Sequence, residues 1–372
     1  MAVFSRYLAL GLLKRGHEIH VVCPATKFAD YTENDDGIVV HRVKAIKNPF
    51  RPKLKVSFLP KAAIAKLFIE LKPDIVHLQD PTGISSQVLK QCKKHHIPAI
   101  ATNHFSFDYV LSYLPLLKPF HPLLSKILEQ YLVKFYNQCS YLTFPSETIR
   151  EEFKSQKLRT KSEAVSNGVN LDQFFPSFNF DDIRLKYHLP NNPIVLHVGR
   201  LDQDKSASVI LEAFFKIKPS LSAHLVVVGD GNDLKKLKAL AAENHAETHV
   251  TFTGFVGHDE LPKIYQLSSV FITASTIETQ GIVALEAMAS GLPIIAPNAG
   301  ALPELVKEGV NGYLFKADNA QELAHKIDMV LIDADNAKKM GENSLEIVEK
   351  HQVDNSYDTF ENIYNLVTQK KK

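Results

Sequence analysis

The sequence has no tryptophan and only three cysteines, Cys23, Cys92 and Cys139. The cysteines are scattered and show neither CxxC nor Cys/His ligand spacing, so the sequence indicates no disulfide framework and no zinc site. No run approaches the roughly 18 uninterrupted apolar residues that a membrane-spanning helix needs. The first residues lack the basic and apolar regions of a signal peptide, and we therefore expect a cytoplasmic protein.

The overall composition is that of a soluble globular protein, with 45% apolar and 23% charged residues. A chain of 372 residues exceeds the usual size of a single core and predicts two domains. Residues 1–165 contain 24 basic and 14 acidic residues, whereas the remainder contains 19 and 27. The basic first half favours an acidic partner, such as a phospholipid surface or nucleic acid, although lysine-rich solvated helices explain the count equally well.

Short apolar runs rich in β-branched residues alternate with longer helix-like stretches, which is typical of a parallel sheet with crossover helices. Residues 170–193 are rich in Asn, Asp, Phe and Pro without sustained periodicity, and we expect a linker and domain entry there. The pattern predicts an α/β protein with two doubly wound domains separated by a cleft. The expected strands are residues 18–23, 37–43, 74–78, 98–102 and 141–144 in the first half, and 194–198, 224–228, 249–253, 270–273, 293–296 and 312–315 in the second.

A polar loop follows the expected strand at 270–273, and Gly281 then begins an alanine-rich helix. In open parallel sheets the ligand crevice lies beyond the carboxyl ends of the strands, so this loop is a candidate site. The first N–H groups of the helix, at Gly281, Ile282 and Val283, form an anion site with the positive end of the helix dipole. Glu278 in the loop can accept hydrogen bonds from sugar hydroxyls, and Glu286 in the helix can hold a vicinal diol such as a ribose. Taken alone, each glutamate is better explained as a capping acid or a solvated helix residue.

A second polar cluster, which begins at Gly199, follows the first strand of the same half. Departure of a nucleoside diphosphate builds negative charge on oxygen, and Arg200 and Lys205 can neutralise that charge without a metal ion. Asp202 and Asp204 in the same loop resemble a metal-binding pair, but we interpret them as solvated loop carboxylates, because magnesium prefers phosphates and few protein ligands. We therefore expect no metal site and no cofactor beside a nucleotide-sugar substrate.

Five motifs together identify a family. They are Gly199-Arg200-Leu-x3-Lys205, Glu278-x7-Glu286 with Gly281 between, Asn167-Gly168-Val169, Thr102-x-His104 and Arg15-Gly16-His17-Glu18. With these motifs nearly the whole chain resembles glycosyltransferase family 4, retaining enzymes with the GT-B fold, and is similar to bacterial glycolipid or polysaccharide hexosyltransferases. The resemblance implies a Rossmann-like acceptor domain over residues 1–170, a Rossmann-like nucleotide-sugar domain over 171–350, and a helix over 351–372 that returns to the first domain.

The resemblance also implies the roles of the donor-side residues. Arg200 and Lys205 would contact the donor diphosphate, Glu278 the transferred sugar and Glu286 the ribose. The leaving phosphate oxygen would itself take the acceptor proton on the same face of the sugar, so no dedicated protein base is needed. Two residues that follow the strand at 249–253 would lie beside the nucleobase, namely Phe255 and Val256.

The acceptor side is expected in the first domain. His104 lies just past a strand end and matches a family position that touches the donor sugar or acceptor, where a neutral ring nitrogen can accept from a hydroxyl. Asn103 and Asp80 also follow expected strands and are acceptor-side candidates, with turn formation as the alternative for Asp80.

Two features depart from the family pattern. Ser206 stands where the family commonly has glycine after Lys205. Residues 1–7 resemble the helix that normally follows a first strand and a glycine-rich loop, so we expect the first domain to lack its usual N-terminal strand, through a late start codon or a truncation. If the polypeptide starts at Met1, exposed strand edges should make that domain unstable.

Two basic, apolar segments suggest the acceptor. Residues 51–61 interleave cations with apolar side chains, residues 114–136 are apolar and dotted with lysines, and basic amphipathic segments lie on anionic membranes. We therefore favour transfer of a hexose from UDP-glucose, or from GDP-mannose, to a membrane lipid such as diacylglycerol at the inner face of the cell membrane. A soluble or polymer-linked sugar acceptor in polysaccharide synthesis, or a catalytically silent nucleotide-sugar-binding paralogue, are the alternatives. Nucleic-acid binding is not expected, since no aromatic-basic motif supports it.

Overall fold

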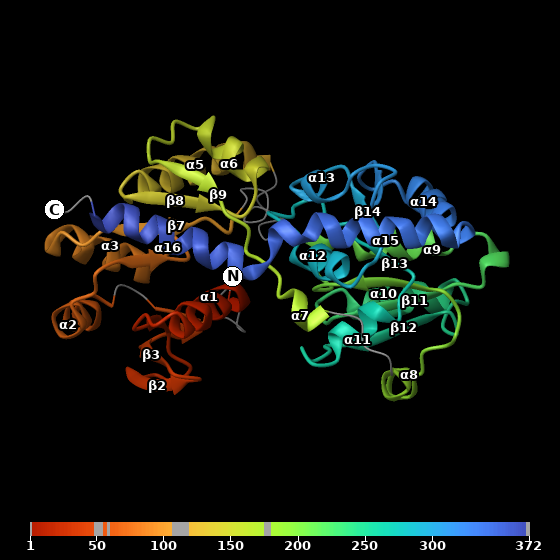
Figure 1. The fold of residues 1–372 in the computed structure, drawn as a ribbon, viewed down its shortest axis with the longest axis horizontal. Coiled ribbons are helices and arrows are strands. Elements are labelled where there is room, and N and C mark those ends of the chain that lie inside the picture. Colours follow the sequence, from red (N-terminus) through yellow and green to blue (C-terminus); the bar gives the residue numbers. More distant parts are fainter. Residues whose placement is uncertain (1, 48–54, 58–59, 106–118, 175–179, 370–372) are drawn as a thin grey trace. The chain divides into compact units, whose positions relative to one another are not determined.

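The computed structural model describes residues 2–47, 55–57, 60–105, 119–174 and 180–369. These residues form two compact units (Figure 1). The first unit contains the described residues up to Val165 and those from Ser356 onward, and the second contains Ser166–Asn355. Within the described residues, the chain passes from the first unit to the second after Val165 and returns after Asn355.

The strands of the first unit form separate sheets. One is an all-parallel sheet in the order β6-β7-β8-β9, and another has the order β1-β3-β2 with β1 parallel and β2 antiparallel to β3. A short antiparallel pair, β4-β5, stands apart. The bounds are β1 His20–Pro24, β2 Tyr31–Asp35, β3 Ile38–Val43, β4 Ile46–Lys47, β5 Lys55–Val56, β6 Val76–Leu78, β7 Ala99–Thr102, β8 Tyr141–Phe144 and β9 Ser162–Ala164.

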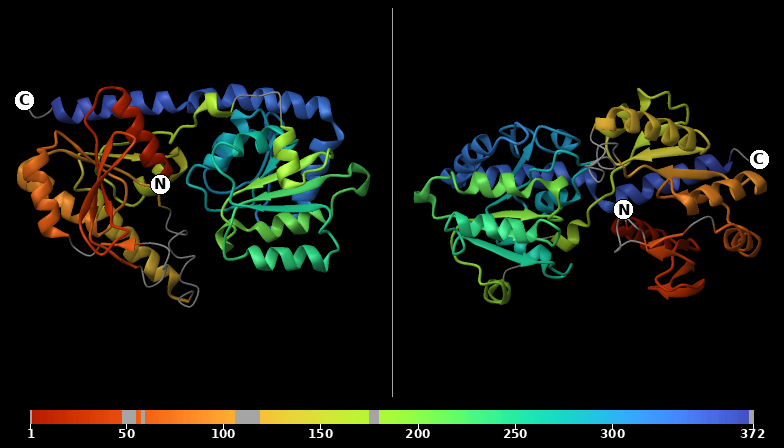
Figure 2. Two further views of the ribbon diagram at one scale, coloured as in Figure 1. Left: turned by 90° about the horizontal axis from the view of Figure 1, so that it is seen from below. Right: turned by 180° about the vertical axis from the view of Figure 1, so that it is seen from behind.

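The helices of the first unit cover both faces of the β6-β9 sheet. Helices α3, α5 and α6 connect successive strands in one direction, so right-handed crossovers place them on one face, where they share a core with α2. On the other face, α16 packs its Phe360 against His77 of β6 and against Phe4 of α1, and Figure 2 shows α16 and α1 side by side. The bounds are α1 Ala2–Lys14, α2 Lys61–Leu71, α3 Gly83–His95, α5 His121–Tyr136, α6 Glu147–Lys154 and α16 Val353–Gln369.

The second unit is built on one six-stranded parallel sheet in the order β12-β11-β10-β13-β14-β15. The chain builds the sheet outward from β10 in one direction and then from β13 in the other, so β10 and β13 flank a topological switch point. Ligands of such sheets bind beyond the carboxyl ends of the strands at that point. The bounds are β10 Ile194–Val198, β11 His224–Val228, β12 Val250–Gly254, β13 Val270–Ile272, β14 Ile294–Pro297 and β15 Gly312–Phe315.

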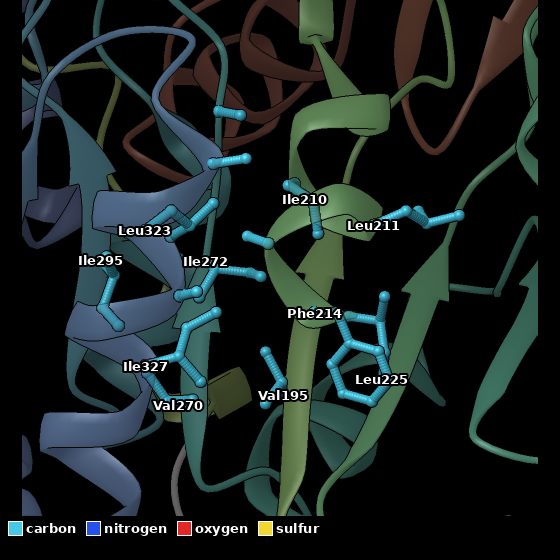
Figure 3. Packing of buried hydrophobic residues seen from close by; sticks show 14 of the residues in the cluster. Val195, Ile210, Leu211, Phe214, Leu225, Val270, Ile272, Ile295, Leu323 and Ile327 are labelled. Atoms are coloured by element: carbon cyan, nitrogen blue, oxygen red, sulfur yellow. The ribbon is translucent and has the colours of Figure 1, made fainter. Parts of the chain in front are cut away.

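Helices bury both faces of this sheet, which explains why most of its strands are continuous apolar runs, whereas the edge strand β12 alternates apolar and polar residues. Val195 of β10 faces a core shared with α9, α10 and α14 (Figure 3), and the next residue, Leu196, faces a core shared with α7, α8, α11 and α12. The bounds are α7 Leu171–Phe174, α8 Asp181–Tyr187, η2 Gln203–Lys205, α9 Ala207–Phe214, η3 Pro219–Leu221, α10 Leu234–Glu243, α11 Leu261–Gln266, α12 Ile282–Ala289, α13 Leu302–Leu305, α14 Ala320–Ile332, α15 Ala334–Val348 and η4 Glu349–His351.

The α/β architecture and all eleven expected strands are confirmed. The expectation of an irregular linker over residues 170–193 is wrong in part, because this stretch contains α7 and α8, which pack apolar side chains onto the second core. The segment 51–61 lies largely outside the described residues, as do the first residues of 114–136. No helix among the described residues is long and apolar enough to cross a membrane.

Candidate active site

Lys205 and Glu278 meet at the switch point of the second unit. Lys205 ends the short helix η2 after β10, and Glu278 lies in the loop after β13. The Lys205 Nζ lies 2.5 Å from the Glu278 Oε1 and 3.5 Å from the Oγ of Ser275, and the side chains of Lys205 and Glu278 are only 18% and 16% exposed. Two residues separated by 73 positions thus form an ion pair at the point where sheets of this topology bind their ligands.

Arg200 is held by the two aspartates of its own loop. Its guanidinium donates to Asp202 and, at 2.7 Å, to Asp204, whose side chain is 2% exposed. The interpretation of Asp204 as a solvated carboxylate is therefore wrong, because the guanidinium compensates its charge inside the protein. Asp202 also accepts hydrogen bonds from the backbone and side-chain nitrogens of Asn232, at 3.1 and 2.9 Å. These contacts fix the direction in which Arg200 presents its charge.

Gly281 begins α12 in a conformation that only glycine adopts easily, with a φ of +90°. A Cβ on Gly281 would lie 2.9 Å from the Leu302 Cδ2, so the Leu302 side chain would have to shift. Among the described residues no side chain caps the helix, and its first N–H groups, at Ile282 and Val283, have no partner within it. Glu278 is thus not a capping residue, and the N-terminus of α12 can bind an anion.

Glu286 is half-buried and its carboxyl group has a hydrogen-bond partner in the protein. The Tyr265 hydroxyl of α11 donates to Glu286 Oε2 at 2.8 Å, and burial raises the pKa of Glu286 to about 7. The alternative of an ordinary solvated helix position is therefore wrong. Tyr265 was not predicted, because it precedes Glu286 by 21 residues on a different helix and no spacing in the sequence connects them.

The ends of β10, β11 and β12 approach one another closely. Gly199 N donates to Val228 O at 3.0 Å, and a Cβ on Gly229 would collide with the carbonyl oxygen of Gly199. At the end of β12, Phe255 is 78% exposed, whereas Val256 is buried in the core. The nucleobase contact stays a prediction for both residues, for Phe255 with its exposed ring and for Val256 with its side chain packed in the core.

In the first unit, His104 is a neutral residue. Its Nε2 lies 2.9 Å from the Oε1 of Gln79, which as a carbonyl oxygen only accepts, so Nε2 carries the proton and Nδ1 keeps a lone pair. Burial lowers the pKa of His104 to about 3. The ring of Phe4 packs edge-on against it at 5.2 Å. The predicted use of a neutral ring nitrogen as a hydroxyl acceptor is compatible with this tautomer.

The other two acceptor-side candidates make hydrogen bonds within the first unit. The amide of Asn103 is fully buried, accepts from the Tyr136 hydroxyl at 2.9 Å and donates to Phe105 O at 2.8 Å. Asp80 Oδ1 accepts from the backbone N and the hydroxyl of Thr82, the residue before α3. Asp80 therefore forms the turn that was its alternative role, and its other carboxylate oxygen stays an acceptor-side prediction.

Comparisons with known proteins match both halves of the chain. The family model described as Glycosyltransferase Family 4 matches residues 1–173, and the model described as Glycosyl transferases group 1 matches residues 179–346. The protein belongs to glycosyltransferase family 4. An uncharacterized glycosyltransferase of Methanocaldococcus jannaschii is 29% identical to this family 4 enzyme, with 98% of this chain and 94% of the relative covered.

Two further comparisons concern a named synthase and a solved structure. The alpha-monoglucosyldiacylglycerol synthase of Acholeplasma laidlawii is 29% identical, with 85% of this chain and 81% of that protein covered. The crystal structure of Anabaena HepE in complex with UDP and glucose superposes with a TM-score of 0.71 at 22% identity, covering 88% of this chain and 85% of HepE. The glycosyltransferase thus has the GT-B fold of two Rossmann-like domains.

Proposed function

We propose that this glycosyltransferase moves a hexose, with UDP-glucose as the favoured donor, to a membrane lipid such as diacylglycerol, with retention at the anomeric carbon. The observation that carries the lipid acceptor is the exposed face of α5 in the first unit. The donor assignment rests on the cations and carboxylates at the switch point of the second unit.

The α5 face consists of residues that are solvent-exposed although many are apolar. Leu123, Ile127 and Tyr131 recur every four residues and are 59%, 55% and 48% exposed. Lys126 and Lys134 lie among them and are also exposed. None of the exposed residues of α5 is acidic, and its one carboxylate, Glu129, is half-buried and accepts from Ser125 at 3.2 Å.

A helix face of this composition suits the surface of an anionic bilayer. Apolar side chains can enter the boundary between headgroups and acyl chains, while the lysines contact anionic headgroups, each worth about 1 kcal/mol near the surface. The similarity to a synthase named for a glucosylated diacylglycerol supports the same class of acceptor. Binding at the membrane would bring the enzyme to an acceptor that does not dissolve in water.

The donor would enter beside the Lys205–Glu278 pair. Its diphosphate would take Lys205 as partner and contact Arg200, which would free the Glu278 carboxylate for hydroxyls of the hexose. The bond from the anomeric carbon to the phosphate oxygen would break while the acceptor hydroxyl attacks on the same face. The acceptor proton would pass to the leaving phosphate oxygen, and Arg200 and Lys205 would stabilise the charge that builds there. Because these cations do that work, we expect EDTA to leave the rate unchanged.

The test is an assay of nucleoside diphosphate release with four acceptor conditions. UDP-glucose and GDP-mannose are each offered with diacylglycerol in anionic vesicles, diacylglycerol in neutral vesicles, a soluble sugar, or no acceptor. We expect the highest release with UDP-glucose and anionic vesicles, and a glycolipid whose anomeric configuration matches the donor by NMR. Faster release of nucleoside diphosphate with the soluble sugar would show that the acceptor is a sugar and not a lipid. No release with any donor would indicate a catalytically silent paralogue.

The α5 face is tested by vesicle sedimentation. The variant Ile127→Glu should lose binding to anionic vesicles, and high salt should weaken binding of the wild type. Leu185→Glu is the matched control, because Leu185 is 76% exposed on α8 of the second unit. Equal binding by the wild type and Ile127→Glu would show that α5 does not contact the membrane surface.

A further inference from the structure

The side chain of Gln280 lies in the donor loop, between Glu278 and Gly281, yet it is only 3% exposed. Both ends of its amide bind the segment where the chain enters the second unit. The Oε1 accepts from Asn167 N at 3.0 Å, and the Nε2 donates to the Ser166 hydroxyl at 2.6 Å. The site described above assigns no role to Gln280.

The hydroxyl of Ser166 uses its one donor and both of its acceptor lone pairs in hydrogen bonds. Its oxygen lies within 3.1 Å of three nitrogens, those of the Gln280 side chain, the Gly168 backbone and the His351 ring at Nδ1. The first two can only donate, and they fill both lone pairs of the oxygen. The hydroxyl proton must therefore go to the Nδ1 of His351, which makes His351 a neutral ring with its proton on Nε2. Burial, which lowers the pKa of His351 to about 4, acts in the same sense.

His351 connects this network to the second crossing of the chain. Val169 N donates to His351 O at 2.9 Å, and Val353 N donates to Val169 O at 3.1 Å. The chain leaves the second unit shortly afterwards, after Asn355. Through Ser166 and Val169, the entering and leaving segments are thus bonded to each other, and Gln280 bonds the donor loop to both.

We propose that Gln280 is a positioning residue that holds Glu278 and the start of α12 in place by fastening the donor loop to the two chain crossings. Elsewhere the loop is held by the bond from Ala301 N to Glu278 O and by the Lys205–Glu278 ion pair. The ion pair loosens when a donor takes Lys205, so during turnover the loop depends on its remaining attachments. A displacement of about 1 Å at a reacting group can lower the rate about 100-fold.

The first experiment is hydrogen exchange on the unliganded protein, which requires no knowledge of the donor. We expect Gln280→Leu to raise amide exchange in two separate segments, residues 275–283 and 166–169, which it joins in the wild type. Asn311→Ala is the matched control, because the Asn311 amide is also fully buried and makes two bonds, with Leu305 O and Lys307 N. Unchanged exchange in both segments of Gln280→Leu would overturn the proposal.

The second experiment separates positioning from stability by kinetics with UDP-glucose. We expect Gln280→Leu to lower kcat about 10- to 100-fold while the Kd for UDP changes less than about threefold, since the nucleotide is held by other residues. Ser166→Ala should have a similar effect, and the double variant should be no worse than the more impaired single variant, because both changes break one connection. Asn311→Ala, compared at equal folded fraction, should keep its kcat within about twofold.

A kcat for Gln280→Leu within twofold of the wild type, or an equal loss in Asn311→Ala, would show that Gln280 serves stability alone. Failure of this proposal and failure of the proposed function would give different results. If the wild type does not turn over UDP-glucose, the donor assignment is wrong, while the exchange experiment still decides whether Gln280 fastens the loop.

Discussion

The two units of this glycosyltransferase place different chemistry at the carboxyl ends of their parallel strands. In the second unit these ends carry charge, with Lys205 paired to Glu278 and Arg200 paired to Asp204. In the first unit two of the three acceptor-side candidates carry no charge, since His104 is a half-buried neutral ring and Asn103 is bonded to its neighbours, and the third, Asp80, bonds Thr82 through Oδ1. The second unit is thus suited to a charged ligand, and the first to neutral hydroxyl groups.

Desolvation explains how each arrangement survives without a ligand. A buried charge is costly unless an opposite charge compensates it, so the cations of the second unit have carboxylate partners in the unliganded protein. A phosphate can replace a carboxylate as the partner of Lys205, which makes the ion pair exchangeable. A neutral imidazole needs no counter-charge and can be buried with one hydrogen bond to Gln79.

Of the variants that test this difference between the two units, Glu278→Ala should have the largest effect on the transfer rate. We expect transfer to fall at least about 10²–10³-fold, because a partner of the transferred sugar is lost and Lys205 keeps no counter-charge in the empty site. Release of labelled nucleoside diphosphate measures the rate. Glu308→Ala is the control, since Glu308 pairs with Lys326 in the same unit but is 51% exposed, and its rate should not change. An unchanged rate in Glu278→Ala would overturn the assignment of the donor site.

Acidification should affect the first unit through its neutral histidines. Burial lowers the pKa of both His77 and His104 to about 3. A lowered histidine pKa contributes stability that is present above the unfolded value of 6.5 and is lost as the pH falls toward 3. Between pH 7.5 and 5 we expect the free energy of unfolding to fall by about 2 kcal/mol for each of these groups. Urea denaturation of the wild type and of His77→Gln measures the loss, which should be smaller in the variant.

The second unit offers the contrast to that acid effect. His197 and His351 there also have pKa values lowered to about 4, but the raised pKa of Glu286 acts in the opposite direction over the same pH range and offsets part of their effect. Peptide-resolved hydrogen exchange, compared at matched intrinsic exchange rates, would show which unit loses stability at low pH. An equal loss of protection in both units at pH 5 would contradict this difference.

The fold was most predictable where strands are buried on both faces. In the second unit all six strands were predicted, five from apolar runs and β12 from alternating apolar and polar residues, and β10, β11 and β15 have the predicted bounds. The strands that were missed, β2, β4, β5 and β9, all lie in the first unit. β4, β5 and β9 have two or three residues, and β2 is the polar run Tyr31–Asp35, paired only with β3. Such strands lack the hydrophobic pattern from which a strand is recognised.

The charged residues of the site were predictable from the sequence, whereas the residues that hold these charged residues in place were not. The strand-end rule and the family motifs both selected Lys205 and Glu278, and the structure brings them into contact. Tyr265, which bonds Glu286, and Gln280, which fastens the donor loop, act through contacts between segments distant in the sequence. Burial also decided the state of Asp204 and Glu286, and a charged side chain in a sequence does not reveal whether a neighbour will cover it.

A smaller effect is expected from the pH dependence of donor binding at Glu286. A ribose diol needs both carboxylate oxygens as acceptors, and the pKa of about 7 leaves the group partly protonated at neutral pH. The affinity for UDP should rise up to tenfold per pH unit below 7 and level off above it, as measured by isothermal titration calorimetry. The raised pKa acts oppositely on the unliganded protein, where its stabilisation is complete below pH 4.5 and is lost as the pH rises through 7. Glu286→Gln should remove both dependences, and an equally steep binding curve in that variant would exclude Glu286 as their origin.

The smallest effect should come from Asp80→Ala, which tests whether the first unit also carries a charged ligand site. Asp80 accepts two hydrogen bonds from Thr82 at the start of α3, so its loss should lower the free energy of unfolding by about 1 kcal/mol, as for a lost helix cap. We expect the acceptor KM to stay unchanged, and kinetics over a range of acceptor concentrations with thermal denaturation measures both quantities. A raised acceptor KM without loss of stability would instead assign the second oxygen of Asp80 to the acceptor. Both units would then present a functional carboxylate at a strand end. The remaining difference would be the cations Arg200 and Lys205, which only the donor side needs.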